Sequence, residues 1–414
     1  MSQLRNYALV TAAYWAFTLT DGALRMLVLL HFHALGYSPV SLAFLFLFYE
    51  FFGIVTNLLG GYLAAQLGLK VTLTAGLLVQ VAALGALCGL QPEWSVALSV
   101  AWVMAAQALS GIAKDLTKMS AKSFIKVLIP EDGNGALFKW VALLTGSKNA
   151  LKGCGFFLGG LLLTVLGFKG ALFAMAISIA LVFVAAQLSL PAGLGRTKAK
   201  AKFKGMFSKN REVNLLSAAR FFLFGARDVW FVVGVPVFLY ELGWSFTQVG
   251  AFLALWVIGY GVVQSFAPLL IRRWQAGAAP GGSTLAVLAF ALSGATAAIA
   301  IGLHQGAPAV PMIVGGLAAF GALFALNSSV HSYLILAYSD GDKVAMNVGF
   351  YYMSNAAGRL VGTLLSGLLF QRAGVPGCLW GSVLFSALAG GLSLGLARTA
   401  TPVALESLIE SGGE

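Results

Sequence analysis

The stretch "SKNALKGCGFFLGGLL" (residues 147–162) is matched 207 positions later by "SNAAGRLVGTLLSGLL" (354–369), without a gap. The corresponding positions are Ser147 with Ser354, Lys152 with Arg359, Gly155 with Gly362 and Gly160 with Gly367. The same shift places "LGYS" (35–38) over "LGWS" (242–245), and it matches Asp21 to Asp228. The sequence therefore consists of two related halves, each with a cation inside an apolar, glycine-rich segment.

The composition indicates the environment of these segments. Hydrophobic residues make up 59% of the 414 positions and charged residues only 10%, and the mean hydropathy is +0.88. Soluble domains carry about 25% charged residues. The apolar residues come in runs of about 20 or more, which is the length that crosses a hydrocarbon core. We predict an all-α polytopic membrane protein. Its first apolar run, 8–32, is expected to be a retained helix, because it contains charges and exceeds a signal-peptide core.

Twelve spans are separated by gaps that contain proline, glycine or charge. They are residues 8–33, 40–66, 71–90, 95–125, 135–167, 169–190, 213–241, 247–271, 282–303, 309–336, 343–372 and 376–397. A long polar stretch, 195–212, follows the sixth span. The predicted organisation is a six-helix bundle at 1–190, a basic cytoplasmic linker at 191–212, a second six-helix bundle at 213–398 and a cytoplasmic tail at 399–414.

Lysine and arginine are distributed unevenly between alternate loops. With both termini in the cytoplasm, the outside loops hold two cations, Lys169 and Arg372, and the inside loops and ends hold sixteen. This is the positive-inside pattern that sets orientation. It accounts for most of the net charge of +12 without a nucleic-acid partner. The basic linker is expected to be a topology signal that lies near anionic membrane lipid.

A duplication of six spans with a basic central loop resembles the major facilitator superfamily. The loop "GGYLAAQLGLK" (60–70) resembles the superfamily's loop signature, although Ala65 and Leu69 replace its acidic residue and its arginine. The segment "GFFLGG" (155–160) resembles its fifth-helix antiporter motif without the proline. The resemblance implies two pseudo-symmetric six-helix bundles and alternating access, with the substrate between the bundles near the membrane midplane.

Charged residues inside the spans are the main functional signal. Each costs roughly 2.5–3.5 kcal/mol at a helix centre and normally faces a bundle interior or a water-filled cavity. The eight cations are Arg25, Lys114, Lys118, Lys148, Lys152, Arg220, Arg227 and Arg359. The four acids are Asp21, Glu50, Asp115 and Asp228. A surplus of four positive charges predicts a cavity that receives an anion, and we take all eight cations as candidate substrate-binding residues.

The acids are candidates for salt bridges or for a coupling proton. Asp21 can pair with Arg25 four residues later, and Asp115 with Lys118 three residues later. Glu50 could neutralise a cation on another helix. Asp228 follows Arg227 directly, and neighbours on a helix point about 100° apart, so these two are not expected to face each other.

Three of these cations are expected to bind the substrate together. Lys148 and Lys152 project from nearly the same helix face, and Arg359 is the repeat partner of Lys152. An arginine fork opposed by ammonium groups suits a phosphate-like or carboxylate group. Lys152 and Arg359 are expected to contact substrate, and the alternative is a structural bridge to Glu50 or Asp228. Lys114 and Lys118 could form the inner rim of an anion path.

The motifs of other function classes do not occur in the sequence. The cysteines, Cys88, Cys154 and Cys378, are scattered without metal spacing. There is no phosphate loop, nucleotide fingerprint or zinc motif, so no cofactor, metal site or direct ATP coupling is predicted. An integral membrane enzyme would need a nucleophile or metal cluster that the sequence does not offer. We predict no catalytic residues.

Four stretches carry a narrower resemblance. They are "YWAFTLTDGALRMLVLLHFHALGYSP" (14–39), "QALSGIAKDLTKMSAKSFIK" (107–126), "LLTGSKNALKG" (143–153) and "SAARFFLFGARDVWFVV" (217–233). They resemble the bacterial ArsJ family of organoarsenical efflux permeases. This implies export of 1-arseno-3-phosphoglycerate across the inner membrane, arsenate resistance, and a functional link to glyceraldehyde-3-phosphate dehydrogenase, which makes the ester. We expect a monomer that works as a uniporter or as a proton antiporter.

Two other transporter classes remain as alternatives. An organophosphate or sugar-phosphate exchanger would use the same cations but run in the opposite direction. A cationic drug exporter is disfavoured, because like charges in the cavity would repel its cargo.

Overall fold

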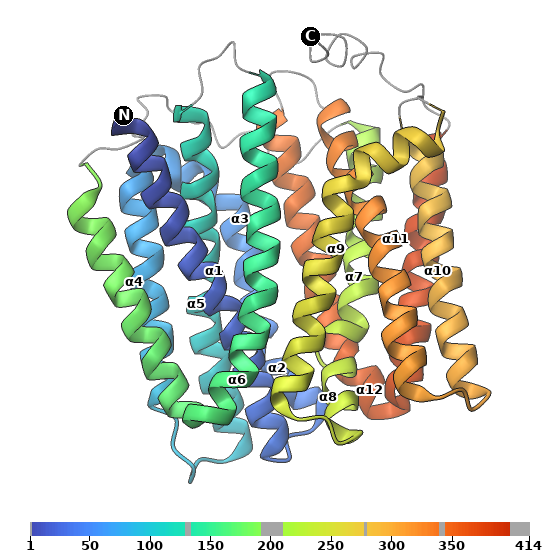
Figure 1. Cartoon of the computed structure of the whole chain (residues 1–414), viewed down its shortest axis with the longest axis horizontal. Helices are drawn as coiled ribbons and strands as arrows, with labels where there is room; N and C mark the ends of the chain where they lie inside the picture. The colour runs from blue at the N-terminus through green and yellow to red at the C-terminus, as the bar shows by residue number, and fades with distance from the viewer. Residues whose placement is uncertain (1, 129–133, 192–209, 277–279, 339–343, 398–414) are drawn as a thin grey trace. The chain divides into compact units, whose positions relative to one another are not determined.

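The computed structural model describes residues 2–128, 134–191, 210–276, 280–338 and 344–397, and every regular element in these ranges is a helix (Figure 1). The helices are α1 (Ser2–Ala34), α2 (Pro39–Leu45), α3 (Leu47–Leu67), α4 (Leu69–Cys88), α5 (Val96–Leu128), α6 (Asn134–Ser189), α7 (Arg211–Phe231), α8 (Gly234–Glu241), α9 (Phe246–Trp274), α10 (Gly282–His304), α11 (Ala309–Ala337) and α12 (Val344–Ala397). The predicted all-α class is confirmed. Most of the predicted linker and all of the predicted tail lie outside the described residues.

Length and hydropathy identify the membrane crossings. Nine segments within the described helices are long and apolar enough to span a membrane. Two of them, Ser147–Ser189 and Gly349–Leu396, are 43 and 48 residues long. Each of these contains one glycine with a positive φ, Gly167 at 66° and Gly374 at 61°, where the helix kinks. Each therefore supplies two crossings, and the predicted boundaries between spans five and six and between eleven and twelve fall at these kinks.

Two predicted spans are interrupted. Residues 40–66 form α2 and α3, which meet at Phe46, and residues 213–241 form α7 and α8. At the second break the backbone N–H groups of Val233 and Gly234 each donate to the hydroxyl of Ser366 on α12, at 3.1 Å. Pro236 removes a further donor just after the break. The side chain of Ser366 thus satisfies two donors that a continuous helix would have paired internally.

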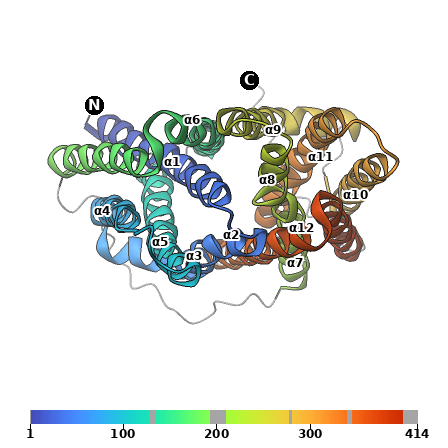
Figure 2. The same cartoon turned by 90° about the horizontal axis from the view of Figure 1, so that it is seen from below.

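The chain divides into two compact units. The first comprises Met1–Lys202 with Pro236–Ile258, and the second comprises Phe203–Val235 with Gly259–Glu414. In the first unit α1 packs against α6 and α5, and α5 also packs against α3 and α4 (Figure 2). In the second unit α12 packs against α7 and α10, and α10 packs against α11. The segment 236–258 joins the first unit through α9, where a Cβ on Gly250 would lie 2.7 Å from the carbonyl oxygen of Phe156 on α6.

Glycines bring the same pair of helices together in both units. Between α1 and α6, a Cβ on Gly22 would lie 2.7 Å from the carbonyl oxygen of Lys152, and a Cβ on Gly155 would overlap the carbonyl oxygen of Leu19. Between α7 and α12, a Cβ on Gly362 would lie 2.8 Å from the carbonyl oxygen of Gly225. Gly155 and Gly362 are repeat partners. Small residues permit this close backbone approach in membranes.

Replacing Gly155 with alanine tests the first seam. The methyl group would meet backbone of α1 that has no flexible atom to yield, so we expect a loss of about 1–3 kcal/mol, as for overpacked cores. The control is Gly85→Ala on α4, where nothing lies within 4 Å of the added Cβ. Thermal unfolding of the detergent-purified variants is the measurement. Equal melting temperatures for the two variants would contradict the close approach.

Candidate functional site

The charged residues of the spans gather in three clusters. The Tyr49 cluster comprises Asp21, Arg25, Tyr49, Glu50 and Lys152, and the Asp115 cluster comprises Thr56, Asn57, Lys114, Asp115 and Lys118. Both belong to the first unit. The arginine cluster of the second unit comprises Arg220, Arg227, Asp228 and Arg359 with the ring of Phe224.

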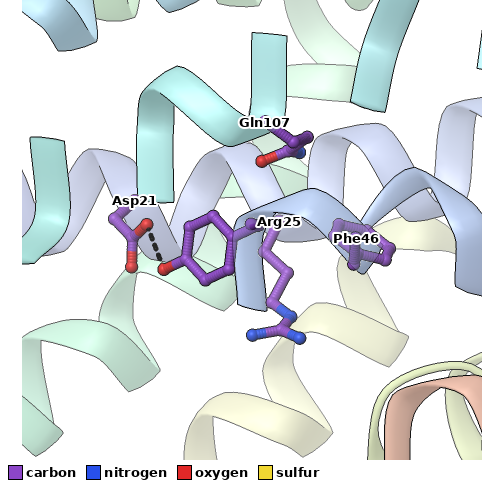
Figure 3. Close-up of a pocket in the computed structure, with 5 residues that line it drawn as sticks. Asp21, Arg25, Phe46 and Gln107 are labelled. Carbon is purple, nitrogen blue, oxygen red and sulfur yellow. Dashed lines mark hydrogen bonds between the residues drawn. The ribbon is translucent and has the colours of Figure 1, made fainter. Parts of the chain in front are cut away.

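In the Tyr49 cluster, Asp21 of α1 contacts two other helices. The hydroxyl of Tyr49 on α3 donates to Asp21 Oδ1 at 2.7 Å (Figure 3). Lys152 Nζ on α6 lies 3.7 Å from Asp21 Oδ2. The carboxylate is 6% exposed and the tyrosine 4%. Lys152 therefore makes a structural bridge of the kind that was the alternative to substrate contact, with Asp21 as a partner that the sequence analysis had not named for it.

Arg25 makes its ion pair with a different helix from the one predicted. Its Nη1 and Nη2 both donate to Glu50 Oε1 of α3 at 3.3 Å, whereas Asp21, on its own helix, is bound by Tyr49 and Lys152. The predicted Asp21–Arg25 pair is therefore wrong. The prediction that Glu50 would neutralise a cation across helices is confirmed. A spacing of four residues permits two side chains on one helix to touch. Here the packing of neighbouring helices gives Asp21 and Arg25 other partners.

The Asp115 cluster confirms the other local pair. Asp115 on α5 is fully buried and forms an ion pair with Lys118. It also accepts a hydrogen bond from Thr56 Oγ1 of α3 at 2.8 Å. Lys118 donates in turn to Asn57 Oδ1 at 2.6 Å. This network ties α3 to α5, and it gives Lys118 a structural role beside any contact with an anion.

Tyr49 also contacts Lys114. The ammonium group of Lys114 lies 4.1 Å from the centroid of the Tyr49 ring, while the hydroxyl of the same residue binds Asp21. Cation–π contacts of this kind stabilise by about 0.5–2 kcal/mol. Tyr49 therefore joins α1, α3 and α5 at one level of the first unit. It was missed by the sequence analysis, which considered charges alone.

In the arginine cluster two guanidinium groups share one carboxylate. Arg227 Nε donates to Asp228 Oδ1 at 2.6 Å, and Arg359 Nε donates to Asp228 Oδ2 at 3.0 Å. Asp228 is completely buried, whereas the two arginine side chains remain 12% and 16% exposed. The expectation that Arg227 and Asp228 would not face each other is wrong, because the arginine side chain reaches the carboxylate of the next residue. The predicted alternative of an Arg359–Asp228 bridge is confirmed.

Arg220 lies two turns before Arg227 on α7. Its Nε donates to Asn355 Oδ1 at 3.0 Å, and its Nη1 donates to the hydroxyl and the carbonyl oxygen of Ser328 at 3.0 and 3.3 Å. Its guanidinium carbon lies 3.9 Å from the centroid of the Phe224 ring. None of these described partners is negatively charged. The last of the predicted cations, Lys148, is half-buried on α6, one turn before Lys152.

The formal charges of the clusters differ. The Tyr49 cluster has two cations and two acids, and the Asp115 cluster has two cations and one acid. The arginine cluster has three cations and one acid, which gives the largest positive excess of the three. The predicted surplus thus persists although five of the eight cations contact a carboxylate. Lys152 and Arg359 each contact an acid on another helix.

The repeat relates two of these ion pairs. Asp21 corresponds to Asp228, and Lys152 corresponds to Arg359. Lys152 bridges to Asp21 across the α1–α6 seam, and Arg359 bridges to Asp228 across the α7–α12 seam. Each half therefore contains the same acid–base contact between the same two helices. Among the described residues, the second half adds another cation, Arg227, to the shared carboxylate.

The buried pair of Arg25 and Glu50 generates a stability prediction. Glu50→Gln leaves a guanidinium that is 8% exposed without its carboxylate, and breaking such a pair costs about 3–5 kcal/mol. We expect a large drop in melting temperature for Glu50→Gln in detergent, and partial recovery in the double variant Arg25→Gln/Glu50→Gln. A single variant as stable as the parent would show that the pair has no structural role.

The chain matches a known protein family. The family described as "Major Facilitator Superfamily" matches residues 10–300 of the chain. No curated protein matches its sequence.

Solved structures agree with the fold. The inward-open conformation of the xylose transporter XylE from E. coli has a TM-score of 0.71 at 14% identity, covering 98% of this chain and 99% of that one. A point mutant of the nucleoside transporter NupG has a TM-score of 0.70 at 13% identity, with 95% and 98% covered. A D-xylose–proton symporter has 0.67 at 12%, with 95% and 96% covered. These similarities show the fold, and the family match over residues 10–300 establishes that the chain belongs to the major facilitator superfamily.

Proposed function

We propose that the chain exports a small, multiply negative organoarsenical, 1-arseno-3-phosphoglycerate, from the cytoplasm by alternating access. Cells that make this ester from arsenate would thereby become arsenate-resistant. The proposal combines membership of a transporter superfamily with the resemblance of four stretches to the ArsJ family. The single observation that carries it is the pair of arginines, Arg227 and Arg359, which share one buried carboxylate.

The chemistry of that pair suits a phosphate-like group. Asp228 contacts Nε and Nη2 of Arg227 and Nε of Arg359, and a guanidinium group carries five N–H donors in a planar fork. Such forks bind tetrahedral oxyanions through two parallel hydrogen bonds. The positive excess attracts an anion, while the fixed carboxylate prevents the cluster from holding it too tightly. A transporter needs both properties, because its cargo must leave as well as enter.

The membrane potential favours export of such a cargo. In a cell that is negative inside, each expelled negative charge gains about 2.3 kcal/mol per 100 mV. We further propose that the protein lies in the bacterial inner membrane, with both termini in the cytoplasm, the orientation that the distribution of basic residues favours. It would act as a monomer, supplied with ester by glyceraldehyde-3-phosphate dehydrogenase. Proton antiport would assign Asp21, Glu50 or Asp228 as the proton carrier.

Charge removal in the arginine cluster tests the proposal in cells. We expect Arg359→Gln and Arg227→Gln each to abolish arsenate tolerance in an arsenate-sensitive bacterial host, while the protein remains in the membrane. Arg372→Gln is the matched control, because Arg372 is an exposed arginine on the same helix as Arg359. Growth on arsenate and membrane immunoblots are the measurements. Full tolerance in both cluster variants would refute the assignment.

Transport by everted vesicles distinguishes export from exchange. The ester is generated outside the vesicles by glyceraldehyde-3-phosphate dehydrogenase with glyceraldehyde 3-phosphate, NAD and arsenate. An exporter should accumulate arsenic inside, measured by mass spectrometry, and omission of NAD should stop accumulation. Uptake that requires preloaded phosphate or sugar phosphate would instead favour the organophosphate exchanger. No uptake under either condition would contradict both functions.

A further inference from the structure

Arg220 and Arg227 both contact one aromatic ring. They are seven residues apart on α7, which corresponds to nearly two turns and places them on the same helix face. The guanidinium carbon of Arg220 lies 3.9 Å from the centroid of Phe224, and that of Arg227 lies 5.0 Å from the same point. The two guanidinium carbons are therefore no more than about 9 Å apart. The two guanidinium groups therefore place two positive charges along one face of α7.

Arg220 retains hydrogen-bonding capacity that the described residues do not use. An arginine has five N–H donors on three nitrogens. In Arg220, Nε and Nη1 donate to Asn355 and Ser328, whereas Nη2 makes no hydrogen bond within the described part of the chain. The residue is 5% exposed. An acceptor placed at this nitrogen would form a charge-assisted hydrogen bond.

Other buried polar atoms near Arg220 also lack partners among the described residues. Ser217 lies one turn before Arg220 on α7, and its hydroxyl oxygen is buried without a hydrogen bond. His331 lies one turn after Ser328 on α11, close enough for the charge of Arg220 to act on it, and its Nδ1 is likewise unpaired. The ring of Tyr351 lies 5.1 Å from the guanidinium carbon. The surroundings of Arg220 are therefore polar and incompletely satisfied.

A purely structural role does not account for this arrangement. Arg25 of the first unit, which is buried to a similar degree, is neutralised by Glu50. Arg220 has only neutral partners among the described residues, and a buried charge without a counter-charge is strongly unfavourable. Helix cross-linking could be done by a neutral amide at lower cost. An anion that binds at Nη2 would supply both the missing counter-charge and the missing acceptor.

We propose that Arg220 forms a second anion subsite, separate from the Arg227–Arg359 pair. The preferred cargo would then carry an anionic group at each end of a short carbon chain. One group binds between Arg227 and Arg359, and the other reaches past Phe224 to Arg220. This inference rests on the proposed function and deepens it, because it selects doubly anionic compounds over singly anionic ones of the same length.

Two stable probes test the subsite. Propane-1,3-diphosphonate has an anionic group at both ends, and propylphosphonate has the same chain with one such group. Binding of each to the full-length protein in lipid nanodiscs is measured by calorimetry. We expect the parent protein to bind the diphosphonate at least ~10-fold more tightly, which corresponds to one additional charge-assisted contact. Arg220→Gln should remove this preference, and Arg220→Lys should restore part of it.

Two controls separate binding from folding. Arg273→Gln removes an exposed arginine at the end of α9 and should leave the preference intact. Arg359→Gln should weaken both probes, because it damages the first subsite. Equal loss of both probes in Arg220→Gln, or a parent protein that binds them equally, would overturn the second subsite alone. A parent protein that binds neither probe would overturn the proposed function and this inference with it.

Discussion

The contact between an acid on one helix and a base on another, across a glycine seam, is the constraint on which the site depends. Asp21 meets Lys152 between α1 and α6, and Asp228 meets Arg359 between α7 and α12. The side chains can meet inside the membrane because glycines let the two backbones approach closely. A wider seam would leave each ion with lipid or water as its neighbour, at a cost of several kcal/mol. Packing and electrostatics therefore depend on the same small residues.

The two halves have used this shared contact differently. In the first, Tyr49 and Glu50 complete a cluster in which the described charges cancel, and it is closely packed against α3 and α5. In the second, Arg227 and Arg220 add positive charge around a single carboxylate. The Tyr49 cluster of the first half is therefore neutral, whereas the arginine cluster of the second half has two more cations than acids. Gene duplication followed by local substitution is sufficient to produce this division.

Much of the fold could be predicted from the sequence, because its determinants are local. Span length, hydropathy and loop charge identify the crossings, and the expected boundaries within the two longest helices coincide with the kinks at Gly167 and Gly374. The repeat also identified the acid and the base of both seams, and the Arg359–Asp228 bridge was among the pairings considered, whereas the Lys152–Asp21 bridge was not. The sequence did not predict every ion-pair partner correctly. Arg25 had an acid four residues away and instead paired with Glu50, since helix packing decides which carboxylate is nearest. Tyr49 was missed because it is uncharged and only charged residues were considered. Its role depends on contacts with helices that are distant in the sequence.

The break between α7 and α8 lies where the chain passes from one unit to the other. The chain passes from the second unit to the first between Val235 and Pro236, just after the backbone amides held by Ser366, and it passes back between Ile258 and Gly259 within α9. A Cβ on Gly259 would meet nothing within 4 Å. The backbone is held differently at these two places. At the first the helix is broken and one serine hydroxyl accepts from both freed amides, whereas at the second the helix is continuous and the glycine has open space where a side chain would lie.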